Sequence, residues 1–230
     1  MASADPELPT AAAGDIRSQA APIAGVGRRS LLALIAAAIA GVFFWVDSAL
    51  PYLILDQAHL SVYPPTAKRV SILVHISFGT IALLTGPVQL WLGLSGRRLG
   101  VHRRLGQIYM VAVLCSALAG FYLSTQSESF VFATGVFGLA VAWVMTTGLA
   151  YVAVRRHKIE QHKEWMIRSY VVTFAFVTFR IPFRILLAAH IADFPSVAGA
   201  CAWFCWAVPL LLTEAFLQAR KVFAIPGERE

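Results

Sequence analysis

Residues 131–154 read VFATGVFGLAVAWVMTTGLAYVAV, a stretch of 24 residues without a charged side chain. At a helical rise of about 1.5 Å per residue, about 20 apolar residues cross the hydrocarbon core of a bilayer. Lipid offers no hydrogen-bond partner to an open backbone, so a run this long and continuous predicts a transmembrane helix. The fold of the whole chain then depends on how often such a run recurs.

Five further runs of this kind are present. They are residues 31–54, 70–94, 105–124, 165–190 and 197–219. The joints between them are short and carry turn-forming or charged residues. We therefore expect an all-α, polytopic bundle of six transmembrane helices that forms one domain, residues 30–220. Residues 1–29, rich in Ala, Pro, Gly and Asp, are expected to form a disordered cytoplasmic tail, and residues 221–230 a second cytoplasmic tail.

The composition excludes a soluble globular domain. Hydrophobic residues make up 58% of the 230 residues and charged residues only 13%, whereas soluble domains carry about 25% charged residues. The net charge of +7 would suggest nucleic-acid binding in a soluble protein, but here the basic residues form short clusters between apolar runs. That pattern indicates membrane topology, and no nucleic-acid partner is expected.

Lys and Arg are distributed unevenly over the joints and helix ends. One side of the membrane receives twelve of them, while the other receives Lys68 and Arg69. Because basic loops stay in the cytoplasm, both termini are predicted to be cytoplasmic, which agrees with an even number of spans. The expected location is the inner (cytoplasmic) membrane of a bacterium, with membrane lipid as a partner.

Ionisable residues at membrane depth are costly and therefore mark candidate sites. Counting about 1.5 Å per residue from the helix ends places one polar layer near the cytoplasmic surface. In this layer His102 opens the third helix and His162 immediately precedes the fifth. Tyr109, Arg168 and Glu214 lie at a similar level.

A second polar layer lies toward the outer surface. Arg180 and Arg184 are four residues apart and share a helix face, and Pro182 between them predicts a kink. Asp47 is available to neutralise one of these arginines. A second polar pocket is expected here, formed by His75, Arg180, Arg184 and Asp47. His75 and Arg180 would bind a quinone or a lipid head group, although a structural hydrogen bond explains either residue equally well.

Gly86–Pro87 predicts a bend in the second helix. Proline has no N–H, so the carbonyl one turn earlier loses its helical partner. Gln89 follows closely and is the expected replacement donor.

Two histidines at equal depth on different helices can hold one haem iron between them. His102 and His162 fit this test, with Arg168, Arg103 or Arg104 as the partner of the cofactor's carboxylates. Tyr109 is expected nearby in the same site. A metal ion bound by His102, His162 and Glu214 is the second possibility. We therefore predict haem b or a metal ion as the cofactor of a protein in electron transfer or membrane redox chemistry.

A non-enzymatic role explains the same residues differently. In an accessory or assembly subunit of a membrane complex, or in a small transporter, the polar groups would be helix–helix hydrogen bonds and head-group anchors. This alternative implies membrane protein partners or a homo-oligomer.

Several motif blocks follow one another along the chain. They are His75, then Gly86–Pro87–x–Gln89, then His102–Arg103–Arg104–Leu105–Gly106–x–x–Tyr109, then His162–x–x–Trp165–Met166–x–Arg168–x–Tyr170, then Arg180. Together they resemble a bacterial family of predicted multi-pass membrane proteins that carry a domain of unknown function. The resemblance covers about residues 70–185. It implies a shared helical membrane core and no established reaction. The residues that carry the family pattern are His75, His102, Tyr109, His162, Arg168 and Arg180.

Overall fold

The computed structural model describes residues 27–61 and 66–223, which form nine helices and no strand. The helices are α1 (Arg28–Ser48), α2 (Leu50–Leu53), α3 (Gln57–Leu60), α4 (Ala67–Ser95), α5 (Leu99–Thr125), α6 (Phe130–Arg155), α7 (Ile159–Thr173), α8 (Ala175–Ala188) and α9 (Phe194–Phe223). Six segments are long and apolar enough to span a membrane, with α7 and α8 together forming one of them. The prediction of an all-α bundle with six spans is confirmed. Most of both predicted tails (residues 1–26 and 224–230) lies outside the described residues.

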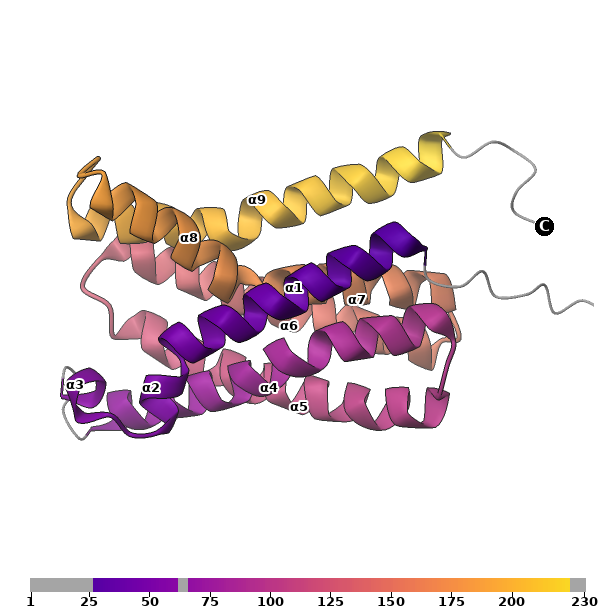
Figure 1. Ribbon diagram of the computed structural model, residues 1–230, viewed down its shortest axis with the longest axis horizontal. Helices are drawn as coiled ribbons and strands as arrows, with labels where there is room; N and C mark the ends of the chain where they lie inside the picture. Colours follow the sequence, from indigo (N-terminus) through magenta and orange to yellow (C-terminus); the bar gives the residue numbers. More distant parts are fainter. Residues whose placement is uncertain (1–26, 62–65, 224–230) are drawn as a thin grey trace, which may run out of the picture.

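The long helices run along one axis of the molecule (Figure 1). Helix α4 packs most extensively against α5, and α6 packs against α7, α5 and α9. In Figure 1, α1 crosses this bundle obliquely, and its start lies at the same end as the finish of α9 and the turn between α4 and α5. We call this the basic end, because it carries the paired arginines Arg97, Arg98, Arg155 and Arg156.

The first span is shorter than the predicted run of residues 31–54. Helix α1 ends at Ser48, and the chain continues into the four-residue helix α2. Pro51 explains the interruption, because it has no N–H to continue the hydrogen bonding of α1. The predicted span is too long because the residues after α1 are also apolar, and hydropathy does not show where the helix ends.

Both candidate histidines lie inside helices, which corrects their predicted positions at or before helix starts. Helix α5 begins at Leu99 and α7 at Ile159, so His102 and His162 are each about one turn in. The polar residues ahead of each apolar run are helical as well. The spans therefore reach further toward the basic end than hydropathy alone indicated.

The fifth span is interrupted at Phe174, between α7 and α8, whereas Pro182 lies inside α8. The hydroxyl of Thr173 donates to the carbonyl of Ser169 one turn earlier, at 2.9 Å. Such back-bonding by Thr bends helices. The predicted kink is thus displaced from the proline by about two turns.

Helix α4 continues through Pro87. Pro87 leaves the carbonyl of Leu83 without its helical donor, and the hydroxyl of Tyr170 approaches that carbonyl at 3.4 Å. The replacement donor is therefore Tyr170 of α7 and not Gln89. A Cβ on Gly86 would overlap the Tyr170 ring, so only glycine permits this close approach of α7 to α4.

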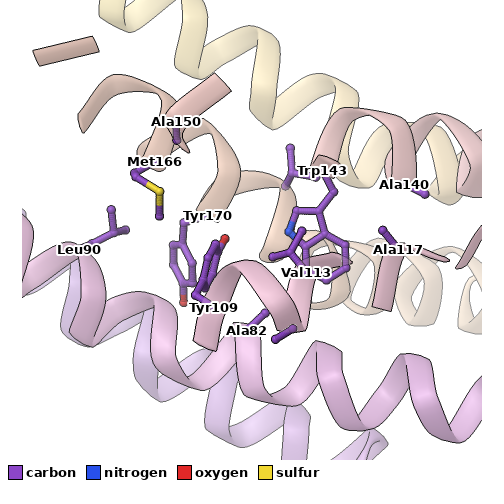
Figure 2. Close-up of a cluster of buried hydrophobic side chains, with 12 residues drawn as sticks. Ala82, Leu90, Tyr109, Val113, Ala117, Ala140, Trp143, Ala150, Met166 and Tyr170 are labelled. Carbon is purple, nitrogen blue, oxygen red and sulfur yellow. The ribbon is translucent and has the colours of Figure 1, made fainter. Parts of the chain in front are cut away.

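The core of the bundle consists of a few large rings set among small residues. Tyr109, Trp143 and Tyr170 are buried together with alanines from α4, α5 and α6. Small side chains allow helices to approach closely in a membrane, where packing replaces the hydrophobic driving force. Figure 2 shows the hydroxyls of Tyr109 and Tyr170 pointing in opposite directions, which places two separate polar contacts within this core.

Candidate functional site

His102 and His162 lie close together near the basic end. Their ring centroids are 6.2 Å apart and their ring planes are nearly perpendicular, at 86°. Helices α5 and α7 both start at this end and run in the same direction, so residues equally far from each start reach the same depth. The fold thus brings together His102 and His162, the two histidines that were predicted to lie at equal depth.

Each ring is held by a hydrogen bond to a backbone carbonyl. Nδ1 of His102 lies 3.2 Å from the carbonyl oxygen of Gln89, and Nδ1 of His162 lies 2.9 Å from that of Ala150. A carbonyl only accepts, so Nδ1 carries the proton in both rings. In the neutral imidazole, Nε2 then has a lone pair, which is the arrangement typical of histidines that ligate a metal.

The face of α4 beside this histidine pair contains a second polar group. A Cβ on Gly93 would lie 2.9 Å from Cε1 of His102, so a glycine there makes room for the ring. Gln89, one turn away on α4, is only 3% exposed, and its Oε1 has no hydrogen-bond partner among the residues that the structure describes. A buried acceptor without a donor is rare in native proteins.

Arg168 is already paired within the protein. Its side chain is 7% exposed, and it donates to Glu214 Oε2 from Nε at 2.8 Å and from a terminal nitrogen at 2.5 Å. Glu164 lies 3.6 Å away on the same helix, and Lys221 pairs with Glu164 at 2.9 Å. Two positive and two negative side chains thus form a network that joins α7 to α9. The assignment of Arg168 to cofactor carboxylates stays a prediction, and this pairing gives it no support.

The predicted metal site of two histidines and Glu214 is not formed. Within residues 27–61 and 66–223, no group of three or more His, Cys, Asp or Glu side chains is placed to hold a metal ion. The physical reason is that Arg168 and Gln218 hold the Glu214 carboxylate by hydrogen bonds.

Tyr109 belongs to a buried network of hydroxyl groups at mid-depth in the bundle. Its hydroxyl lies 2.8 Å from Ser169 Oγ and 2.6 Å from Thr173 Oγ1. Thr147 bonds Ser169 at 2.7 Å, and Trp143 Nε1 donates to Thr173 at 2.8 Å. This network ties α5, α6 and α7 together, and the role of Tyr109 in cofactor binding stays a prediction.

The partners of Tyr109, Ser169 and Thr173, do not stand out in the sequence. They are four residues apart in the fifth span, so they share one helix face, and this spacing is the one signal of their role. A single serine or threonine in a membrane helix often bonds its own backbone, as Thr146 does with Ala142. Spacing alone therefore does not separate the two roles.

The outer-layer residues separate into two groups. Arg184 pairs with Asp47 and also contacts Ser48, which joins α8 to α1. His75 is held by α5, with Nδ1 at 2.9 Å from the Ser116 carbonyl. Asp47 and Arg184 thus form a local ion pair, apart from His75.

A cavity of about 460 Å³ opens between α1, α4, α6, α7, α8 and α9. His75 and Arg180 both contribute to its lining, together with Trp45 and Lys68. Trp143 and Thr173, from the hydroxyl network, border it as well. This volume is within the range of about 300–1,000 Å³ that small-molecule sites occupy.

Six apolar spans enclosing two polar sites define an integral, multi-pass membrane protein. The chain belongs to the family described as predicted membrane protein (DUF2306), which matches residues 72–217. The match extends from α4 into α9, so it includes most of the sixth span, which the sequence resemblance had left outside. No curated protein and no solved structure matches the chain.

Proposed function

We propose that the protein binds one haem through His102 and His162 and takes part in membrane electron transfer. The observation that carries this proposal is the 6.2 Å separation of the two ring centroids. Two imidazoles on opposite sides of one metal, each bonded at about 2 Å, have centroids about 6 Å apart once the ring radii are included. His102 and His162 alone would suffice to hold a haem, so the proposal needs no third ligand beside this pair.

The surroundings of the two rings support the same conclusion. The Nδ1 hydrogen bonds to Gln89 and Ala150 fix each ring and leave its Nε2 with a lone pair. Arg103 and Arg104 are exposed next to His102 and can pair with the carboxylates of the cofactor, in place of the already paired Arg168. When bound, haem would supply one-electron chemistry, while the backbone carbonyls of Gln89 and Ala150 orient the two rings.

The proposal includes an orientation in the membrane. Among the Lys and Arg residues of the loops and helix ends, twelve lie at the basic end and two, Lys68 and Arg69, at the other, while Arg180 and Arg184 lie inside α8. By the positive-inside rule, the basic end and the histidine pair face the cytoplasm of a bacterial inner membrane.

The absorption spectrum of the purified protein tests the proposal. We expect a Soret band and sharp bands on dithionite reduction in the wild type, and their loss in His102→Asn and His162→Asn. His157→Asn is the matched control, because His157 is exposed in the turn after α6. Asn also tolerates the left-handed backbone (φ 58°) of that position.

A well-folded but colourless protein, purified from cells supplied with haem precursor, would overturn the proposal. Equal loss of the bands in the His157 variant would overturn the assignment of the ligands. A colourless protein would favour the accessory-subunit or transporter role, for which co-purifying membrane proteins would be the evidence.

A further inference from the structure

The cavity runs from the end opposite the basic end toward the middle of the bundle. Lys68 is near the start of α4, and Leu83, which also lines the cavity, is 15 residues further along the same helix. At about 1.5 Å per residue these two positions are about 22 Å apart. The space is therefore elongated along the bundle.

The polar groups of the lining gather in its outer part. Lys68, His75 and Arg180 lie there, and none of the described residues that line the cavity is Asp or Glu. The carboxylate of Asp47 on α1 pairs with Arg184 and Ser48 and also interacts electrostatically with Arg180, so it balances only one of the positive charges of Lys68, Arg180 and Arg184. The outer part of the cavity is thus positively charged and suits an anionic group.

Trp45 adds a donor to this region. Its Nε1 is buried and has no hydrogen-bond partner within the described part of the chain. Trp45 belongs to the cavity lining, as Arg180 does. Buried N–H groups are nearly always paired, so a ligand that brings an acceptor would satisfy this one.

The inner part of the cavity is mainly apolar, and the hydroxyl of Thr173, which also borders it, is already hydrogen-bonded within the protein. Leu83, Leu139 and Val172 border this part, and so does Trp143, whose N–H is already bonded to Thr173. An aliphatic chain would bury its surface there without leaving a polar group unpaired.

We propose that this cavity binds a single-chain amphiphile with a carboxylate head. The carboxylate lies beside Arg180, Lys68 and Trp45, and the chain extends inward to Trp143. This site is separate from the histidine pair, and the inference does not depend on whether the protein binds haem.

The test uses fluorescence quenching in nanodiscs of phosphatidylcholine. The probe is 12-bromododecanoate, whose bromine at the end of the chain quenches nearby tryptophan. We expect saturable quenching that is largely lost in Trp143→Phe and retained in Trp45→Phe. The neutral probe 12-bromododecan-1-ol has the same length without the charge, and we expect it to bind about tenfold more weakly or worse, since it lacks the negative charge that the basic side chains of the lining attract.

Two variants locate the head group. Arg180→Gln is expected to weaken binding of the carboxylate about tenfold and to leave that of the alcohol unchanged. Arg97→Gln, at the basic end, is the control for charge removal. It is expected to change the binding of neither the carboxylate nor the alcohol. If Arg180→Gln fails to fold, Lys68→Gln at the outer end of the cavity replaces it.

Equal binding of acid and alcohol by the wild type would overturn the anionic preference, and it would do so without any variant. Quenching that rises linearly without saturation would show partition into lipid alone and would also overturn the proposal. Quenching that persists in Trp143→Phe would place the chain elsewhere.

Discussion

Arg168 directs two nitrogen atoms at one carboxylate oxygen of Glu214 and thereby joins α7 to α9. The arginine side chain is 7% exposed and the glutamate side chain 43%. The guanidinium thus depends on protein partners, while the carboxylate keeps access to polar surroundings. Loss of the carboxylate is therefore expected to cost more than loss of an exposed partner would.

Glu214→Leu is expected to lower the free energy of unfolding by about 1–3 kcal/mol, because it leaves a nearly buried charge with only the more distant Glu164. The double variant Arg168→Met with Glu214→Leu should recover part of that loss, since no unpaired charge remains. Unfolding by SDS titration in mixed micelles measures both. Lys163→Gln, which breaks an exposed pair with Glu160, is expected to change stability by less than about 1 kcal/mol. An equal loss of unfolding free energy in the single Glu214 variant, the double variant and Lys163→Gln would contradict the role of Glu214 as the partner of a buried charge.

Gly86→Ala is expected to destabilise the protein by about 1–3 kcal/mol, because the added methyl group overlaps the ring of Tyr170 and separates α4 from α7. Gly148→Ala is the control, since nothing lies within 4 Å of a Cβ there. That change should be neutral or slightly stabilising in the middle of α6. The same SDS titration distinguishes them, and a neutral Gly86→Ala would show that the helices move apart without cost.

Thr173→Val removes the acceptor of Trp143 and one partner of Tyr109. We expect a loss of about 1–3 kcal/mol, since the indole N–H is then buried without a partner, and a change in the fluorescence of Trp143. Thr134→Val is the control, because the Thr134 hydroxyl bonds only carbonyls of its own helix among the contacts described. An unchanged emission spectrum in Thr173→Val would argue against the network.

Gly93→Ala should displace the His102 ring, because the new Cβ would lie 2.9 Å from Cε1. If the two histidines ligate haem, the variant should bind less haem per protein than the wild type, or show altered reduced bands. The ratio of Soret to protein absorbance measures this. Gly100→Ala, also near the start of α5 but in open space, is expected to keep the wild-type ratio.

The charge distribution predicts where the ends of the chain lie. With both termini in the cytoplasm, a green fluorescent protein fused to the C-terminus should fluoresce, and alkaline phosphatase fused there should be inactive. The reverse pattern would place the histidine pair at the outer face and refute the proposed orientation.

Parts of the candidate site were predictable from residue positions. His102 and His162 were paired because each is close to the start of a helix that begins on the same side of the membrane. The constant rise of a helix converts position along a span into approximate depth, since the backbone within the bilayer is held in a continuous helix. The partner of the Leu83 carbonyl was not predictable in this way: sequence proximity suggested Gln89, but the donor is Tyr170, 87 residues away on α7.

The roles of Arg168 and Glu214 also required the tertiary structure. Their depth placed them in one layer with the histidines, and the sequence allowed either a cofactor role or a metal site. Which groups within a layer meet depends on the rotation of each helix about its own axis and on its neighbours. Arg168 is turned toward α9, so Glu214 neutralises it and is withdrawn from the histidines.

The sequence by itself determined the membrane class, the number of spans and the order of the polar residues along each span, because the thickness and chemistry of a bilayer restrict a chain to long hydrogen-bonded helices. Only the tertiary structure decided which polar residues touch and where a cavity opens. The physical reason is that these helices are apolar on nearly every side. The same apolar side chains therefore suit contact with lipid and contact with protein. Small residues such as Gly86 and Gly93 select the helix faces that pack together, and the hydrophobic pattern does not reveal these faces.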